Sequence, residues 1–361
     1  MGGNTPVFDR QPLSLKDDME APSDFVRRRP ETETHLTHRP DRVAPYLLHK
    51  MNELTFDEFR PEFLIRAGIR DVFSGVPVPL RDEDREAFKT SGGLQSNIIA
   101  ENMARVLGID PKFKHRSVYI EFIDRNFGEK AVDDMTRKAK DYADLEDYED
   151  ACIYFRAGLV LKHNDLAAMY GYARVLRTMY MNSDEQDYIG NLKAESIDFF
   201  EMTTECFPDF DMGWYYLGYM YLNLGLYTKA QLAWSEYLKW SRVQKDCLEI
   251  KKRLEQLKEP VEIERGYNAV LSGRWGKGLE ILERYKESGY NDWWPLWYYL
   301  GVAYARTEQL HEAESAFKRA LQSSPRHIES MRELTDIYEK TGDKTNLKKY
   351  RDKIKLVNQD S

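Results

Sequence analysis

The sequence has 361 residues, 32% of them charged and 42% apolar, a composition typical of a chain that buries a hydrophobic core. Its formal net charge of −8 argues against general nucleic-acid binding, and it has neither an apolar run long enough to cross a membrane nor a hydrophobic signal segment at its start. Cys152, Cys206 and Cys247 are few and far apart, which favours buried thiols in a reducing compartment, the cytoplasm, over disulfides or a metal site.

The first 45 residues are predicted to form an extended or disordered arm. They contain six prolines among charged and polar residues, and no apolar period is sustained along them. Proline removes a hydrogen-bond donor and biases its neighbour toward extended conformations, so this segment has no means of building a core. His35 and His38 lie close together, but no cysteine or third histidine is near them, and we expect a solvated linker without metal.

Residues 46–130 are predicted to form a helical N-terminal cap. Within it, Met103–Asp110 is similar to the first helix and turn of a helix-turn-helix. The surrounding positive charges are Arg105, Lys112, Lys114, His115 and Arg116. A DNA-binding segment near residues 98–125 is therefore an alternative for this region.

One helical pair, from Trp297 to Pro325, carries a pattern that recurs along the chain. Gly301 and Ala313 are small at the positions where two antiparallel helices approach most closely, and large side chains surround that contact. The full pattern is Trp297, Leu300, Gly301 and Tyr304 on the first helix, then Ala313, Phe317 and Ala320 on the second, and Pro325 at its end. Glycine weakens a helix, so Gly301 in mid-helix indicates a packing requirement.

This spacing resembles that of a tetratricopeptide repeat, and further copies can be counted. The small residue recurs at Ala139, Ala173, Gly218, Gly266, Gly301 and Thr335, with separations of 34, 45, 48, 35 and 34 residues. A period near 34 with two insertions predicts about six repeats, at 132–165, 166–210, 211–244, 259–293, 294–327 and 328–361. We expect a loop at the first insertion, near 181–191. The second, near 245–258, should be helical, with Pro260 opening the next repeat.

The resemblance implies an all-α fold, a helical-repeat superhelix preceded by the cap and the arm. It also implies a non-enzymatic scaffold or adaptor, without cofactor or metal, whose partner is a protein or peptide segment held in a concave groove lined by the first helices. Helical geometry points the residues beside the packing stripe into that groove. These are Tyr215, Tyr216, Tyr219, Asn223, Tyr267, Tyr298, Tyr299, Arg306, Arg137, Lys140, Arg174 and Arg177. The groove would thus run from basic through tyrosine-rich to acidic, since the last repeat offers Glu329, Glu333 and Asp336.

Three other interpretations of the sequence stand beside this one. In the first, the tyrosines simply pack neighbouring repeats together. In the second, the chain is a peptide-responsive transcription regulator that joins the DNA-binding segment to peptide-sensing repeats. The third is catalysis, but the sequence has no phosphate-binding glycine loop, no His-Glu-x-x-His and no Gly-x-Ser-x-Gly. A subclass of the family binds chaperone C-termini through a lysine and asparagine clamp. The strongest repeats here carry tyrosine or arginine at the groove positions, so this function is not carried over.

Overall fold

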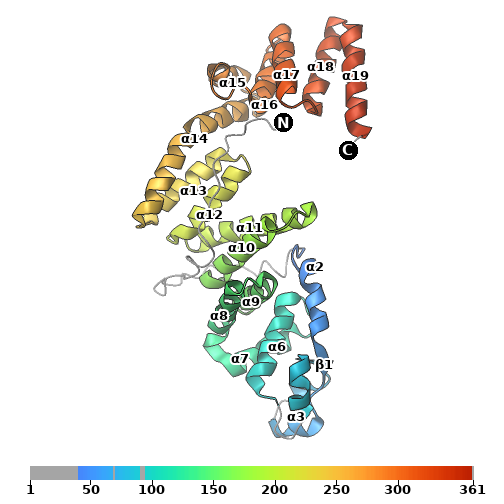
Figure 1. The fold of residues 1–361 in the computed structure, drawn as a ribbon, viewed down its shortest axis with the longest axis vertical. Helices are drawn as coiled ribbons and strands as arrows, with labels where there is room; N and C mark the ends of the chain where they lie inside the picture. Colours follow the sequence, from blue (N-terminus) through green and yellow to red (C-terminus); the bar gives the residue numbers. More distant parts are fainter. Residues whose placement is uncertain (1–39, 68–69, 90–93, 360–361) are drawn as a thin grey trace. The chain divides into compact units, whose positions relative to one another are not determined.

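The computed structural model describes residues 40–67, 70–89 and 94–359, and most of these are α-helical (Figure 1). They form two compact units, residues 40–220 and 221–359, except that Lys239–Ser241 groups with the first. We call these the N-terminal unit and the C-terminal unit. Within each, consecutive helices pack against each other in pairs. The predicted all-α, helical-repeat class is therefore confirmed.

The N-terminal unit begins with short elements. These are α2 (Ala44–Leu47), the 3-10 helix η1 (Leu48–Glu53), β1 (Thr55–Asp57), α3 (Pro61–Ala67), α4 (Arg70–Phe73), β2 (Val78–Leu80), the 3-10 helix η2 (Asp82–Asp84) and α5 (Arg85–Lys89). The predicted helical cap thus includes two antiparallel strands, with Thr55 opposite Leu80. Pro77 and Pro79 explain this difference, because proline disfavours helix and keeps its neighbours extended.

Longer helices follow the short elements. They are α6 (Ser96–Ile109), α7 (Arg116–Phe127), the 3-10 helix η3 (Gly128–Lys130), α8 (Ala131–Asp144), α9 (Tyr148–Leu161), α10 (Leu166–Met181) and α11 (Gln186–Cys206). Glycines mark the closest approaches between them: a Cβ at Gly108 would lie 2.0 Å from the carbonyl oxygen of Ile153, and one at Gly171 would lie 2.2 Å from the Phe155 ring. Helices this close leave no room for a side chain at either glycine.

The start of the described chain is tied to the helices of the N-terminal unit by polar contacts. Arg156 of α9 is fully buried; its guanidinium donates to both carboxylate oxygens of Asp41, at 2.5 and 3.1 Å, and to the carbonyl of Gly108 at 2.6 Å. Arg42 donates to Asp198 of α11 at 2.8 Å. The arm predicted at residues 1–45 lies outside the described residues up to position 39. The described end of the arm, residues 40–45, is therefore held to α9 and α11 by ion pairs.

The C-terminal unit continues the series of helices. α12 (Asp211–Asn223) crosses the division between the units, and α13 (Tyr227–Trp240) follows it. The remaining elements are α14 (Gln244–Leu271), α15 (Trp275–Leu282), the 3-10 helix η4 (Glu283–Tyr285), α16 (Trp294–Arg306), α17 (Leu310–Ser323), α18 (Ile328–Thr341) and α19 (Lys344–Gln359). Leu282, Leu300 and Phe317 are fully buried in its core. The small predicted slots border this core, since a Cβ at Gly266 would lie 2.6 Å from Leu282 and one at Gly301 would lie 2.7 Å from Phe317.

The turns between paired helices repeat one backbone conformation. Five residues with positive φ occupy them: Glu146, Gly225, Gly273, Glu308 and Gly342, with φ between 63° and 77°. Each follows its small-residue slot by seven positions, so the turns keep the register counted from the sequence. A left-handed residue at this place lets the chain reverse within a few residues and start the second helix.

The second insertion, near 245–258, is helical as predicted, whereas the first insertion and the position of Pro260 differ from expectation. The predicted loop near 181–191 is helical from Gln186, because the additional residues mainly lengthen α11. Pro260 lies inside the 28-residue helix α14 instead of opening a repeat. A helix-interior proline removes one backbone hydrogen bond and causes a kink. Pro260 and its neighbours Leu257 and Val261 are buried, and this packing offsets the loss.

The close approach at Gly301 can be tested by adding one methyl group. Gly301→Ala should lower the free energy of unfolding by about 1–3 kcal/mol, because the Phe317 ring must move out of a filled core. Gly276→Ala in α15 is the matched control, since no atom lies within 4 Å of a Cβ there. It should be neutral or stabilising by up to about 1 kcal/mol. Urea unfolding followed by circular dichroism measures both. Equal stability of the two variants would contradict the assigned contact.

Candidate functional site

A row of tyrosines lies on the first helices of the C-terminal unit. Helices α14, α16 and α18 follow one another and make contact. Tyr267 of α14 and Tyr299 of α16 stack, with ring centroids 4.8 Å apart and planes 20° apart, and the Tyr298 ring lies 5.1 Å from that of Tyr299. All three side chains are only partly buried. The predicted tyrosines of this unit therefore form one continuous, partly exposed aromatic surface.

A charged pair stands next to this aromatic surface. Arg306, at the end of α16, is 3.7 Å from Glu333 of α18, and its side chain is 49% exposed. Burial raises the pKa of Glu333, while Arg306 acts to lower it. Pairs this exposed contribute little to stability. The Arg306 guanidinium thus remains largely open to solvent.

The predicted residues of the N-terminal unit pack differently. Tyr215, Tyr216 and Arg174 are 5%, 3% and 3% exposed. The Arg174 guanidinium lies 4.6 Å from the Tyr216 ring centroid and donates to the Tyr170 hydroxyl at 3.0 Å. Cation–π contacts of this kind hold the helices of the unit together. These three side chains therefore pack between helices, which is the alternative given above for the tyrosines.

The other predicted residues are more accessible. Arg177 is partly buried, 5.7 Å from the Tyr216 ring, and Tyr219 is partly buried with its ring 5.0 Å from that of Tyr215. Arg137 is 70% exposed and pairs with Asp134 on its own helix. Lys140 is partly buried and Asn223 is exposed. Their role in binding stays a prediction.

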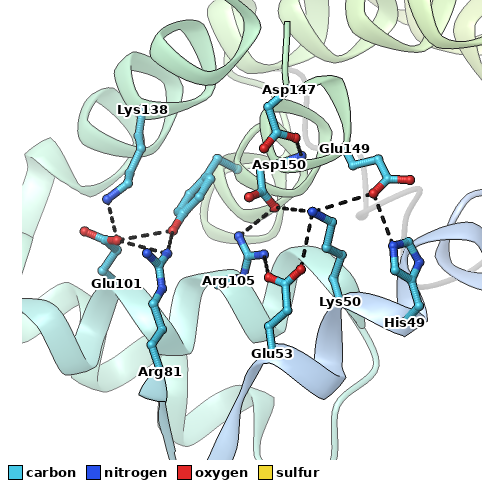
Figure 2. Close-up of polar contacts among 11 residues, drawn as sticks. His49, Lys50, Glu53, Arg81, Glu101, Arg105, Lys138, Asp147, Glu149 and Asp150 are labelled. Atoms are coloured by element: carbon cyan, nitrogen blue, oxygen red, sulfur yellow. Dashed lines mark hydrogen bonds and ion pairs between the residues drawn. The ribbon is translucent and has the colours of Figure 1, made fainter. Parts of the chain in front are cut away.

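A network of charges that no sequence pattern indicated joins η1, α6 and α9 (Figure 2). Arg105 of α6, only 2% exposed, lies 2.7 Å from Asp150 and 2.5 Å from Glu53. Lys50 approaches the same two carboxylates at 3.7 and 3.4 Å, and His49 lies 3.2 Å from Glu149. These partners are up to about a hundred positions apart, so no spacing pattern could have indicated them. Arg105, one of the charges behind the DNA-binding alternative, is committed to this network.

A second part of the network involves Tyr154 of α9. Arg81 donates to its hydroxyl at 2.8 Å, and that hydroxyl donates to Glu101 at 3.2 Å. Lys138 of α8 pairs with the same Glu101. Every charged member has a partner of opposite sign or a hydroxyl. These contacts therefore link α6, α8 and α9 to one another.

His327 caps α18 beside the aromatic surface. Its Nδ1 accepts from the backbone N–H of Ser330 at 3.2 Å, which requires that nitrogen to be unprotonated. The ring lies 4.2 Å from Trp294 and 4.9 Å from Tyr298, centroid to centroid. Burial lowers the pKa of His327, and Glu329, 3.3 Å from Nε2, only partly opposes this. The neutral ring therefore both caps the helix and fills space between two aromatic rings.

Comparison with known proteins supports the repeat assignment. Residues 294–327 match the model of the tetratricopeptide repeat, which confirms the resemblance drawn from Trp297, Gly301 and Phe317. No curated protein matches the chain. Within the described residues, no helix is long and apolar enough to span a bilayer, and no cluster of three or more His, Cys, Asp or Glu is placed to hold a metal ion.

Solved structures of repeat proteins are also similar to this chain. The tetratricopeptide domain of P58(IPK) is 14% identical with a TM-score of 0.41, over 73% of this chain and 75% of that one. The TPR2AB domain of yeast Sti1, in complex with HSP90, is 12% identical with a TM-score of 0.29, over 64% and 93%. YrrB, described as having an unusual peptide-binding site, is 16% identical with a TM-score of 0.29, over 64% and 97%. At these values the likenesses carry no argument of their own.

The capping role of His327 predicts a pH dependence. Because its pKa is lower in the folded chain than in the unfolded chain, protonation favours unfolding. The free energy of unfolding should therefore decline as the pH falls below about 6.5, the ordinary histidine value. Asparagine also caps helices but does not titrate, so His327→Asn should remove this part of the decline. Urea titrations from pH 7.5 to 5.0 on both proteins measure the difference. Parallel pH profiles would contradict the capping role.

Proposed function

Because the chain is a tetratricopeptide repeat protein, we propose that it is a non-enzymatic scaffold or adaptor that binds a segment of a partner protein. The observation that carries the proposal is the stacked, partly exposed row of Tyr267, Tyr299 and Tyr298 on consecutive first helices. Tyrosine offers a large contact area with a polar tip at low entropic cost, which suits peptide capture.

The proposed ligand is an extended or helical segment with aromatic or apolar anchors and some charged residues. In the C-terminal unit its anchors would lie against the tyrosine row, while Arg306 and Glu333 would each pair with an opposite charge. In the N-terminal unit, acidic ligand residues would meet Arg137, Lys140 and Arg177. Arg174, Tyr215 and Tyr216 would act beneath this surface by holding its helices in place.

A cytoplasmic location belongs to the same proposal. Cys152, Cys206 and Cys247 are reduced thiols in the structure. Cys152 is fully buried on α9, and burial raises the pKa of its thiol to about 12. The DNA-binding alternative gains no supporting observation: ten of the fourteen residues of α6 are buried, and Arg105 is engaged by Asp150 and Glu53.

The test is to isolate the partner by pull-down from native cells with mass spectrometry and then measure its affinity for variants of the full chain. Tyr267→Ala/Tyr299→Ala should raise Kd about thirtyfold or more, since truncating a buried interface tyrosine often costs about 2 kcal/mol. Arg306→Glu should instead change the association rate and its salt dependence.

The matched control is Tyr285→Ala/Tyr290→Ala, which removes two partly buried tyrosines from the connection between α15 and α16. It should bind like the parent. If both double variants fold normally and bind equally well, the partner does not use the tyrosine row. Recovery of operator DNA would favour the regulator instead, and a bound small molecule would reopen catalysis.

A further inference from the structure

An open cleft of about 370 Å³ lies in the N-terminal unit, between the start of α9, the end of α10 and the start of α11. Its lining combines the carboxylates of Glu146, Asp147 and Glu149 with the largely apolar surfaces of Met179, Tyr148 and Tyr188. Burial raises the pKa of Tyr188 to about 12, so this ring stays neutral. The cleft therefore offers negative charge beside a neutral aromatic wall.

The carboxylates of the cleft are only partly neutralised. Asp147 accepts from the backbone N–H of Asp150, and Glu149 pairs with His49 and Lys50 at 3.2 and 3.6 Å. Glu146 has no ion-pair partner among the described residues, and it is exposed. Further exposed acids are close in sequence to the lining residues: Asp144, Asp184, Glu185 and Asp187. Such an excess of one sign attracts a cationic ligand.

We propose that this cleft is a docking site for an arginine-rich segment with apolar residues, and that its occupant is the chain's own sequence Phe25-Val26-Arg27-Arg28-Arg29. Phe25 and Val26 match the Met179 and tyrosine wall. The three arginines match the carboxylates, because a guanidinium pairs with a carboxylate and also stacks on aromatic rings.

The connection to the described chain allows this docking. Residues 25–29 lie outside the described part of the chain, which begins at Pro40. Asp41 is held against Arg156 of α9, and the Tyr46 ring lies 4.8 Å from the Tyr188 ring that lines the cleft. Twelve residues from Arg29 to Asp41 span at most about 40 Å. The start of α9 is about 10–15 Å from Arg156 along the helix, which is well within that reach.

This inference does not depend on the proposed function, because the cleft belongs to the N-terminal unit and the tyrosine row belongs to the C-terminal unit. Docking of residues 25–29 would make the cleft an internal binding site whose occupancy falls with salt. An external basic segment could then enter only by displacing the chain's own.

Photo-crosslinking of the full chain tests the occupant. A photoreactive benzoylphenylalanine at position 25 should crosslink to residues 146–149 or 179–188. Irradiating a mixture of isotopically light and heavy protein should give crosslinks within one isotope only. Crosslinks that map elsewhere would overturn the proposed site. Crosslinks that join light to heavy chains would overturn the intrachain occupant, since a second copy would then supply the segment.

Limited trypsin cleavage after Arg27 and Arg28 provides an independent measurement. Glu146→Lys/Asp184→Lys should raise the initial rate about fivefold, the factor expected from losing two surface ion pairs. Asp124→Lys/Glu129→Lys makes the same change in charge on exposed residues of α7 and η3, and should leave the rate unchanged. Moderate salt should speed cleavage of the parent but not of the first variant. Equal rates for the parent and both variants would overturn the proposal.

Discussion

The distance between paired helices is the constraint on which the rest of this structure depends. At Gly301 the neighbouring helix presents the Phe317 ring, and at Gly266 it presents Leu282, so close that a single added carbon would collide. Such contact fixes how each first helix is rotated about its own axis. That rotation decides which side chains enter the core and which, like Tyr267 and Tyr299, remain partly exposed. Surface chemistry here is a consequence of core packing.

Much of the fold was predictable because its determinants are periodic. Small slots such as Gly266 and Gly301 recur with turn residues at a fixed offset, and both signals survive two insertions. The form of the insertions was only partly predictable, since residues 245–258 are helical as expected while the first insertion is not the expected loop. Polar residues after Met181 look like a loop, yet most join α11, and Pro260 looks like a boundary, yet it lies inside α14. Helix length there is set by tertiary contacts rather than by local propensity.

The exposure of the candidate site residues was predictable only in part. Helical geometry placed Tyr298 and Tyr299 correctly beside the packing stripe, because the next first helix leaves them partly uncovered. The same rule did not predict that the side chains of Tyr216 and Arg174 are buried, because neighbouring helices cover them. Ion pairs such as Arg105 with Asp150 join residues distant in sequence, and a pair of charges has no periodic signature. Sequence patterns report the local geometry of one helix, whereas the burial of a side chain depends on which other helices pack against it.

The buried thiol of Cys152 gives the molecule a built-in reporter of its own motions. Alkylating reagents attack only the thiolate, and with burial holding the pKa near 12 almost none exists in the folded chain. Modification must therefore wait until α9 separates from its neighbours, so its rate measures how often the N-terminal unit opens. Cys247, partly buried near the start of α14, belongs to the other unit. Because Cys247 is already partly accessible, its modification needs no opening, and the slow reaction of Cys152 alone reports the motion of its unit.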